Sequence, residues 1–202
     1  MGISLRRKET SERRRDTILH AARTVFARKG YAATVVEDIA EEAGIGKGTL
    51  YLYFPSKEQV YLAALLEDAR TLDAESRGAL AEAPSWRDAL RRYVEVRLSY
   101  FEAHEDFLRI YMTEFRGMCM QGRPLSAELY RLAQDGEALL AQRFAAAAAR
   151  GEMRAADPEL AALMVSDVTR GLIERRLRGW GRPVSAGDTA FAVDMLCRAL
   201  ER

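Results

Sequence analysis

Residues 34–58 read TVVEDIAEEAGIGKGTLYLYFPSKE, and this stretch decides the fold of the first part of the chain. The apolar residues that follow Thr34 recur at helical spacing and predict a helix that ends at Gly44. A second, shorter helix is predicted over residues 47–54, and Pro55 ends it because proline cannot continue a helix. Two helices joined by a short turn form a helix-turn-helix, a motif whose second helix enters the major groove of DNA.

Helices with recognisable ends flank this motif. Apolar residues at helical spacing predict a helix over residues 12–29, and Gly30 can end it in the left-handed conformation. Thr34 and Glu37, three residues apart, are predicted to form a capping box for the first helix of the motif. Ser56 is predicted to cap a long helix that follows. The first three helices therefore predict a small three-helix head.

The remainder of the chain also reads as helical, because Ala, Leu, Arg and Glu dominate it and strand alternation is absent. Cap and turn residues predict further helices over residues 85–101, 107–116, 126–150, 158–178 and 185–202. The residues predicted to cap or begin these helices include Ser85, Ser126, Asp157 and Ser185. The predicted fold class is all-α, with a three-helix helix-turn-helix head followed by a larger helical-bundle body. The predicted domains are residues 1–56 and residues 57–202.

The composition narrows the class of protein. Hydrophobic residues make up 49% and charged residues 30% of the chain, which is typical of a soluble globular protein. We find no signal peptide and no apolar stretch long enough for a membrane span. Cys119 and Cys197 stand outside any C-x-x-C motif, so a reduced, cytoplasmic protein is expected. His20 and His104 lack metal-ligand spacing, and we predict neither a metal, a cofactor nor an enzyme.

Charge is distributed unevenly along the chain. The first 35 residues hold nine Lys and Arg against three Asp and Glu, so this segment carries +6 although the whole chain carries +1. A basic end is what contact with phosphates requires. A solvated charged tail explains the same numbers, and charge alone does not separate the two.

The short helix offers two faces. Leu50 and Phe54 lie four residues apart and are predicted to pack against the head. The opposite side is predicted to face DNA, with Lys47, Gly48, Thr49, Tyr51 and Leu52. Lys57, at the start of the following helix, is placed to bind a phosphate.

The stretch from Thr34 to Glu58, with GTLYLYFPSKE at its end, resembles the signature of TetR-type transcriptional repressors. The resemblance covers residues 12–65 and implies a homodimer with a C-terminal ligand-binding and dimerisation body. It also implies that Thr34, Tyr53 and Lys57 hold phosphates. Two positions depart from the family's usual residues. Gly46 stands where the family often has a serine cap, and Leu52 stands where it often has a polar or aromatic residue.

Aromatic residues gather in the first part of the body. As helical stripes they are typical of a core, but as a group they also fit the lining of an apolar ligand cavity. The candidate ligand-binding residues are Trp86, Tyr93, Phe101, Phe107, Tyr111 and Phe115. Arg97 and Arg109 lie nearby in sequence, so an amphipathic ligand with an acidic end is also compatible with this region.

These observations predict a ligand-responsive regulator of transcription, a repressor that binds a near-palindromic operator as a dimer. A small, mainly apolar or amphipathic effector is expected to release it from DNA. The first alternative is a helix-turn-helix regulator without a small-molecule effector. The second is a helical enzyme, which would need turnover dependent on His20 or His104.

Overall fold

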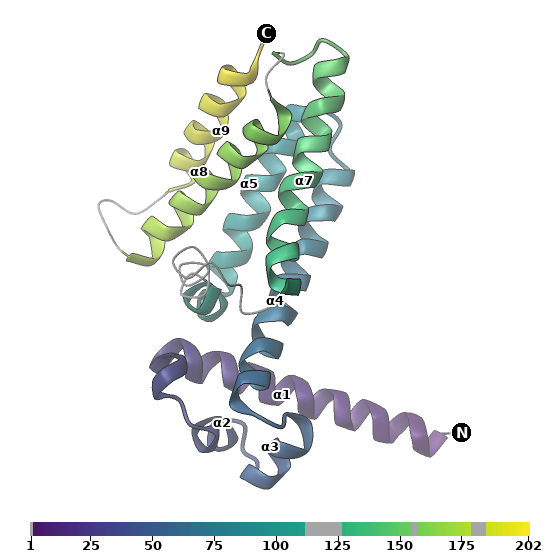
Figure 1. Ribbon diagram of the computed structural model, residues 1–202, viewed down its shortest axis with the longest axis vertical. Coiled ribbons are helices and arrows are strands. Elements are labelled where there is room, and N and C mark those ends of the chain that lie inside the picture. Colours follow the sequence, from purple (N-terminus) through teal and green to yellow (C-terminus); the bar gives the residue numbers. More distant parts are fainter. Residues whose placement is uncertain (1, 112–126, 155–156, 179–184) are drawn as a thin grey trace. The chain divides into compact units, whose positions relative to one another are not determined.

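The structure is a computed structural model, and it describes residues 2–111, 127–154, 157–178 and 185–202. Within these residues the regular structure is helical, without a strand (Figure 1). The fold class is therefore all-α, as predicted. The chain divides into two compact units, and it passes from the first to the second inside one long helix, between Asp68 and Ala69. None of the described helices is long and apolar enough to cross a membrane.

Unit 1 contains the predicted head and the helical residues 105–111. Its helices are α1 (Gly2–Ala33), α2 (Val36–Glu42), α3 (Lys47–Tyr53) and the first half of α4 (Lys57–Ala81). The core of the head is formed by the apolar stripe of α1 with residues of α2, α3 and α4, and it contains Ile18, Leu19, Val25, Phe26, Ile39, Leu50, Phe54 and Val60. This burial of contiguous apolar surface holds the short helices in place.

The ends of two helices differ from the prediction. Helix α1 begins at Gly2 rather than near residue 12, and Gly30 interrupts it with a φ of 76°. The predicted capping box of Thr34 with Glu37 is wrong, because Val35 is the N-cap of α2 and its N–H donates to Asp38 at 3.1 Å. The hydroxyl of Thr34 instead donates to the carbonyl of Gly30 at 2.7 Å, so it does not cap α2.

Unit 2 contains the second half of α4 together with α5 (Trp86–Ala103), α7 (Ala127–Ala149), α8 (Pro158–Arg178) and α9 (Ala186–Leu200). Three predicted caps are confirmed. Ser85 accepts from the N–H of Asp88, Asp157 accepts from two N–H groups at the start of α8, and Ser185 forms a capping box with Asp188. Helices α5, α7, α8 and α9 pack on one another around a core in which Tyr93, Leu140 and Phe144 are fully buried.

Candidate DNA-binding surface

Helix α3 is held by its two buried residues and by the turn before it. Leu50 and Phe54 are buried in the core of the head, as predicted. In the turn, Gly44 adopts a φ of +64°, a conformation that favours glycine, and the N–H of Ile45 donates to Ala40 at 2.9 Å. Gly46 is the N-cap of α3 and makes no side-chain cap bond. The position of α3 therefore rests on packing and the turn rather than on a strong cap.

The opposite face of α3 is open to solvent. Leu52 is 84% exposed and Tyr51 42% exposed, while Lys47 and Gly48 are also exposed and Thr49 is half-buried. A Cβ at Gly48 would meet no atom within 4 Å, so packing within the chain does not require glycine there. An exposed leucine and a helix-weakening glycine on one short face indicate that this surface contacts another molecule.

Lys47 is held by a carboxylate of the neighbouring helix. Its ammonium group donates to Glu37 of α2 and lies 5.9 Å from the centroid of the Tyr51 ring. The hydrogen bond from Lys47 lowers the pKa of Glu37, and the same bond raises the pKa of Lys47. The cation predicted to meet DNA therefore already has an anionic partner.

Lys57 joins the start of α4 to the end of α1. Its ammonium group donates to the carbonyls of Tyr31 and Thr34, at 2.8 Å each, and lies 4.4 Å from the centroid of the Tyr31 ring. Thr34 is fully buried, and its hydroxyl donates to the carbonyl of Gly30 at 2.7 Å. The side chain of Thr34 thus faces inward, and its carbonyl positions Lys57. Tyr53 is half-buried beside the end of α3.

The sequence interpretation passed over several residues of this surface. Val35 is 52% exposed at the start of α2, and Glu37 and Asp38 hold two lysines. Lys29 donates to Asp38 at 2.6 Å, and this bond is the largest cause of the lowered pKa of Asp38. These partners are nine and ten residues apart in sequence, a spacing that helical periodicity does not connect. The four acids of α2 next to a basic α1 were the available signal.

The predicted ligand-binding residues are divided between the two units. Trp86, Tyr93 and Phe101 lie on α5 and are buried in unit 2, whereas Phe107 and Tyr111 belong to unit 1. The ring of Trp86 packs edge-on against Phe144, and the hydroxyl of Tyr93 donates to Ser166 at 3.4 Å. Phe115 lies outside the described residues. Packing against the protein accounts for the three α5 aromatics, and their role in binding a ligand stays a prediction.

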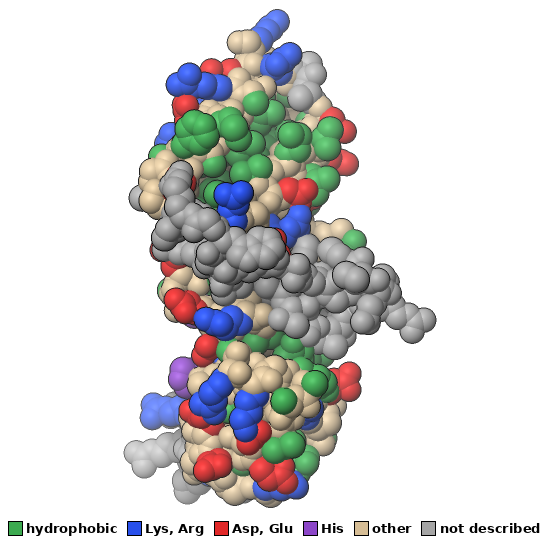
Figure 2. All heavy atoms as spheres, turned by 90° about the vertical axis from the view of Figure 1, so that its left-hand side faces the viewer, with side chains coloured by type: hydrophobic (Ala, Val, Ile, Leu, Met, Phe, Trp, Pro, Cys, Tyr) green, Lys and Arg blue, Asp and Glu red, His purple; other side chains and the backbone are tan. Residues whose placement is uncertain are grey.

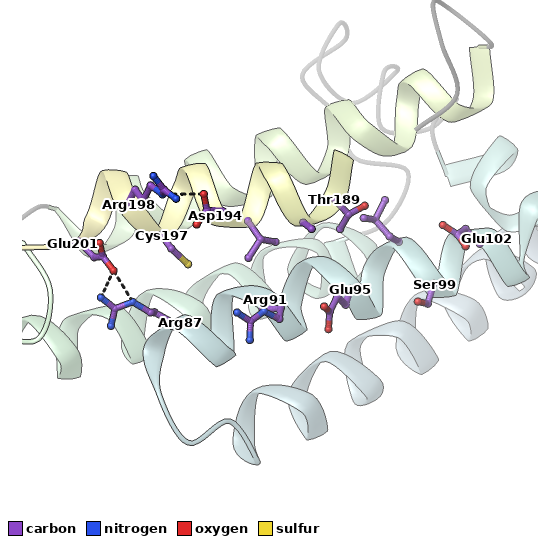
Figure 3. A pocket seen from close by; sticks show the side chains of 13 residues that line it. Arg87, Arg91, Glu95, Ser99, Glu102, Thr189, Asp194, Cys197, Arg198 and Glu201 are labelled. Carbon is purple, nitrogen blue, oxygen red and sulfur yellow. Dashed lines mark hydrogen bonds and ion pairs between the residues drawn. The ribbon is translucent and has the colours of Figure 1, made fainter. Parts of the chain in front are cut away.

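A groove of about 770 Å³ lies between α5 and α9, and none of the predicted ligand residues lines it (Figure 3). Its apolar lining comes from Leu98, Ala190, Val193 and Cys197. Figure 3 shows the arginines toward one end and the acids of α5 toward the other, and Arg87 donates to Glu201. Burial raises the pKa of the Cys197 thiol. The groove is therefore amphipathic, and at its arginine end Arg87 and Arg198 are paired with Glu201 and Asp194.

Helices α8 and α9 pack on each other and expose apolar side chains (Figure 2). The exposed residues are Leu160, Leu163, Met164, Phe191 and Met195. Their spacing of three or four residues places those of each helix on one side. A contiguous apolar surface of this kind is typical of a protein–protein interface.

The two histidines occupy unrelated environments. His20 is exposed on α1, whereas the ring of His104 stacks on Tyr100, with ring centroids 4.1 Å apart. Among the described residues, no three His, Cys, Asp or Glu side chains are placed to hold a metal ion. The enzyme alternative gains no supporting observation from these sites.

Comparison with known proteins gives the following similarities. Residues 18–64 match the family of bacterial regulatory proteins, tetR family. The chain is 40% identical over 89 residues to an uncharacterised HTH-type transcriptional regulator, YfiR of Bacillus subtilis, covering 41% of this chain and 43% of that protein. The chain thus spans less than half the length of the first curated relatives that it matches.

Solved structures match over nearly the whole chain. The TetR family transcriptional regulator PfmR of Thermus thermophilus is 28% identical, with a TM-score of 0.72 over 92% of this chain and 99% of that one. The transcriptional regulator FadR of Bacillus subtilis in complex with stearoyl-CoA is 20% identical, with a TM-score of 0.77 over 90% and 96%. At that identity the second match concerns the fold alone.

Proposed function

We propose that this chain, which belongs to the TetR family of transcriptional regulators, binds a near-palindromic operator as a dimer through α3. One observation carries the proposal: Tyr51 and Leu52 are exposed on a short helix whose other face is fixed in the head by Leu50 and Phe54. A helix held in this way presents the same side chains to the major groove each time it docks.

Each predicted contact residue has a chemically suitable role. Lys47 and Thr49 offer donors to base edges or phosphates, and Gly48 lets α3 approach the groove closely. Tyr51 and Leu52 offer apolar contact with thymine methyl groups. Lys57 and Tyr53 are assigned to phosphates, and Thr34 acts through the position of Lys57. We assign residues 1–56 to DNA binding and the rest of the chain to dimerisation and control.

The dimer is proposed to form through the exposed apolar side chains of α8 and α9. Two such faces bury one another in a symmetric dimer. A dimer that places two copies of α3 about 34–36 Å apart reads two half-sites one helical turn apart.

Selection from random duplexes tests this function. Purified full-length protein is expected to recover a palindrome, and sedimentation of the recovered complex is expected to show two chains on the palindrome. Recovery of duplexes without any shared sequence would contradict operator binding.

We further propose that this protein represses transcription by occupying its operator until an amphipathic effector releases it. The α5–α9 groove supports this choice, because it joins an apolar lining to charged groups and its volume suits a small ligand. FadR, a neighbour in fold, was crystallised with stearoyl-CoA, so palmitate and stearoyl-CoA are suitable probes.

Release is measured by fluorescence anisotropy of the operator complex during titration with each probe. Ala190→Trp fills the groove from an exposed position and is expected to keep operator affinity while losing release. Ala145→Trp, exposed on α7 away from the groove lining and from α8 and α9, is the control and should respond like the wild type. If neither probe releases DNA from the wild type, a regulator without a small-molecule effector becomes the better description.

A further inference from the structure

The N-terminal part of α1 extends beyond the core of the head. Helix α1 starts at Gly2, residues 11–17 are all exposed, and burial in the core begins after them at Ile18. Residues 2–17 therefore form a helical segment about 24 Å long. Figure 1 shows this end of α1 leading away from α2 and α3. We call residues 2–17 the N-terminal overhang.

The rest of the head has little positive charge to offer to DNA. Residues 18–68 hold five Lys and Arg against seven Asp and Glu. All five cations contact oxygen atoms of the same region: Arg23, Arg28, Lys29, Lys47 and Lys57. A phosphate that binds one of these groups must compete with the oxygen atom already there, which weakens the attraction.

Of the three arginines at positions 13–15 of the overhang, Arg15 pairs with Glu67 at 3.7 Å. Arg13 and Arg14 are exposed, and their side chains have no partner within the described part of the chain. The sequence adds Arg6, Arg7 and Lys8, so the overhang carries six basic against three acidic residues. Its net charge of +3 contrasts with the net charge of −2 of residues 18–68 behind it.

The overhang starts close to the recognition helix. The guanidinium group of Arg15 lies 5.5 Å from the centroid of the Phe54 ring, and Phe54 is the C-cap of α3. A DNA duplex that receives α3 in its major groove has backbone phosphates on both sides of the groove. The overhang therefore leaves the head next to the element that enters the groove.

We infer that the N-terminal overhang is a second DNA-binding surface, in which Arg13 and Arg14 contact phosphates that flank the bases read by α3. The inference rests on the proposed function and identifies where the electrostatic part of the affinity arises. Phosphates carry no base identity, so the overhang strengthens binding to any sequence and leaves the preference to α3.

The test compares the salt dependence of the wild type with that of Arg13→Gln/Arg14→Gln, on the recovered palindrome and on a scrambled duplex. Each lost phosphate contact reduces the slope of log affinity against log salt by about 0.9, so four arginines per dimer predict a reduction of about three to four. The ratio of the two affinities is expected to stay unchanged. Glutamine keeps a similar helix propensity, and circular dichroism checks that α1 still forms.

Two further variants make the result specific. Arg131→Gln/Arg154→Gln removes the same charge from exposed positions of unit 2 and is expected to leave the slope near the wild-type value. Arg13→Lys/Arg14→Lys keeps the charge and is expected to restore most of the slope. An equal slope for the Gln variant of the overhang and for the unit 2 control would overturn the inference.

The two proposals fail in different ways. If no palindrome is recovered but binding to the scrambled duplex still depends on Arg13 and Arg14, operator recognition fails and the overhang remains a DNA-binding surface. If a palindrome is recovered and the overhang variant matches the control, α3 recognises DNA without help from the overhang.

Discussion

Two surfaces of this protein expose apolar side chains, and they differ in extent and in the charges around them. The first is α3, seven residues long, where Tyr51 and Leu52 stand next to Gly48 and Lys47. The second runs along α8 and α9, of 21 and 15 residues, with five large exposed apolar side chains. A narrow apolar tip with polar neighbours suits base edges, whereas a long stripe suits another pair of helices. Exposure of apolar residues alone does not identify the partner.

The largest effect is expected on the broad surface. Met195→Asp places a carboxylate in the proposed dimer interface, where a buried unpaired charge costs about 2–5 kcal/mol. The dimer should weaken by at least about thirtyfold in sedimentation experiments. Tyr130→Asp is a matched control, because Tyr130 is 46% and Met195 47% exposed. An unchanged dimer in Met195→Asp would show that α9 does not form the interface.

Substitutions at two neighbouring residues distinguish the outer face of α3 from the inner face that packs in the head. Leu50→Ala removes a fully buried side chain and should destabilise the protein by about 2–5 kcal/mol in denaturant unfolding. Tyr51→Ala should leave stability nearly unchanged and alter the sequence preference by about 1–3 kcal/mol per half-site. If Tyr51→Ala changes stability but not the recovered sequence, this face of α3 does not read DNA.

Lys57 is proposed to serve both the fold and a phosphate contact, so its substitution should affect both. Lys57→Ala removes the donor to two carbonyls, so a loss of about 1–3 kcal/mol in unfolding free energy is expected. Binding should weaken equally for all sequences, because a phosphate contact carries no base information. A changed sequence preference without a loss of stability would assign Lys57 to base reading instead.

The smallest effect concerns the partner of Lys47. Glu37→Gln removes the carboxylate that holds Lys47 and is expected to raise DNA affinity about two- to fivefold, with a steeper salt dependence. Glu41→Gln removes the same charge from an exposed position on the same helix and serves as the control. An equal gain in both variants would mean that general charge, rather than release of Lys47, raises the affinity.

Periodicity and caps predicted the helices well, because both depend on residues close in the sequence. The stripe of Ile18, Val25 and Phe26 is buried, and Leu50 and Phe54 face the core as expected. Ser85 and Ser185 cap their helices through the N–H groups three residues on. The same rules failed at α2, because they favour Thr34 over Val35 as an N-cap, whereas the hydroxyl of Thr34 donates to the carbonyl of Gly30.

The candidate surface was predicted in part. The exposure of Leu52 agrees with its assignment to the outer face of α3. The pairing of Lys47 with Glu37 was not foreseen, because it depends on the angle between two helices. The sequence pattern of the α5 aromatic residues was compatible both with a core and with a cavity lining. The groove beside α9 was not predicted.

The helices, the helix-turn-helix and the residues on each face of α3 therefore follow from local sequence, because helical spacing and capping act over three or four residues. The tertiary structure alone decided which cations are already paired, where a groove lies, and that Thr34 turns inward while Arg13 and Arg14 stay outside. These properties depend on side chains far apart in the chain, whose distances are set by how the helices pack.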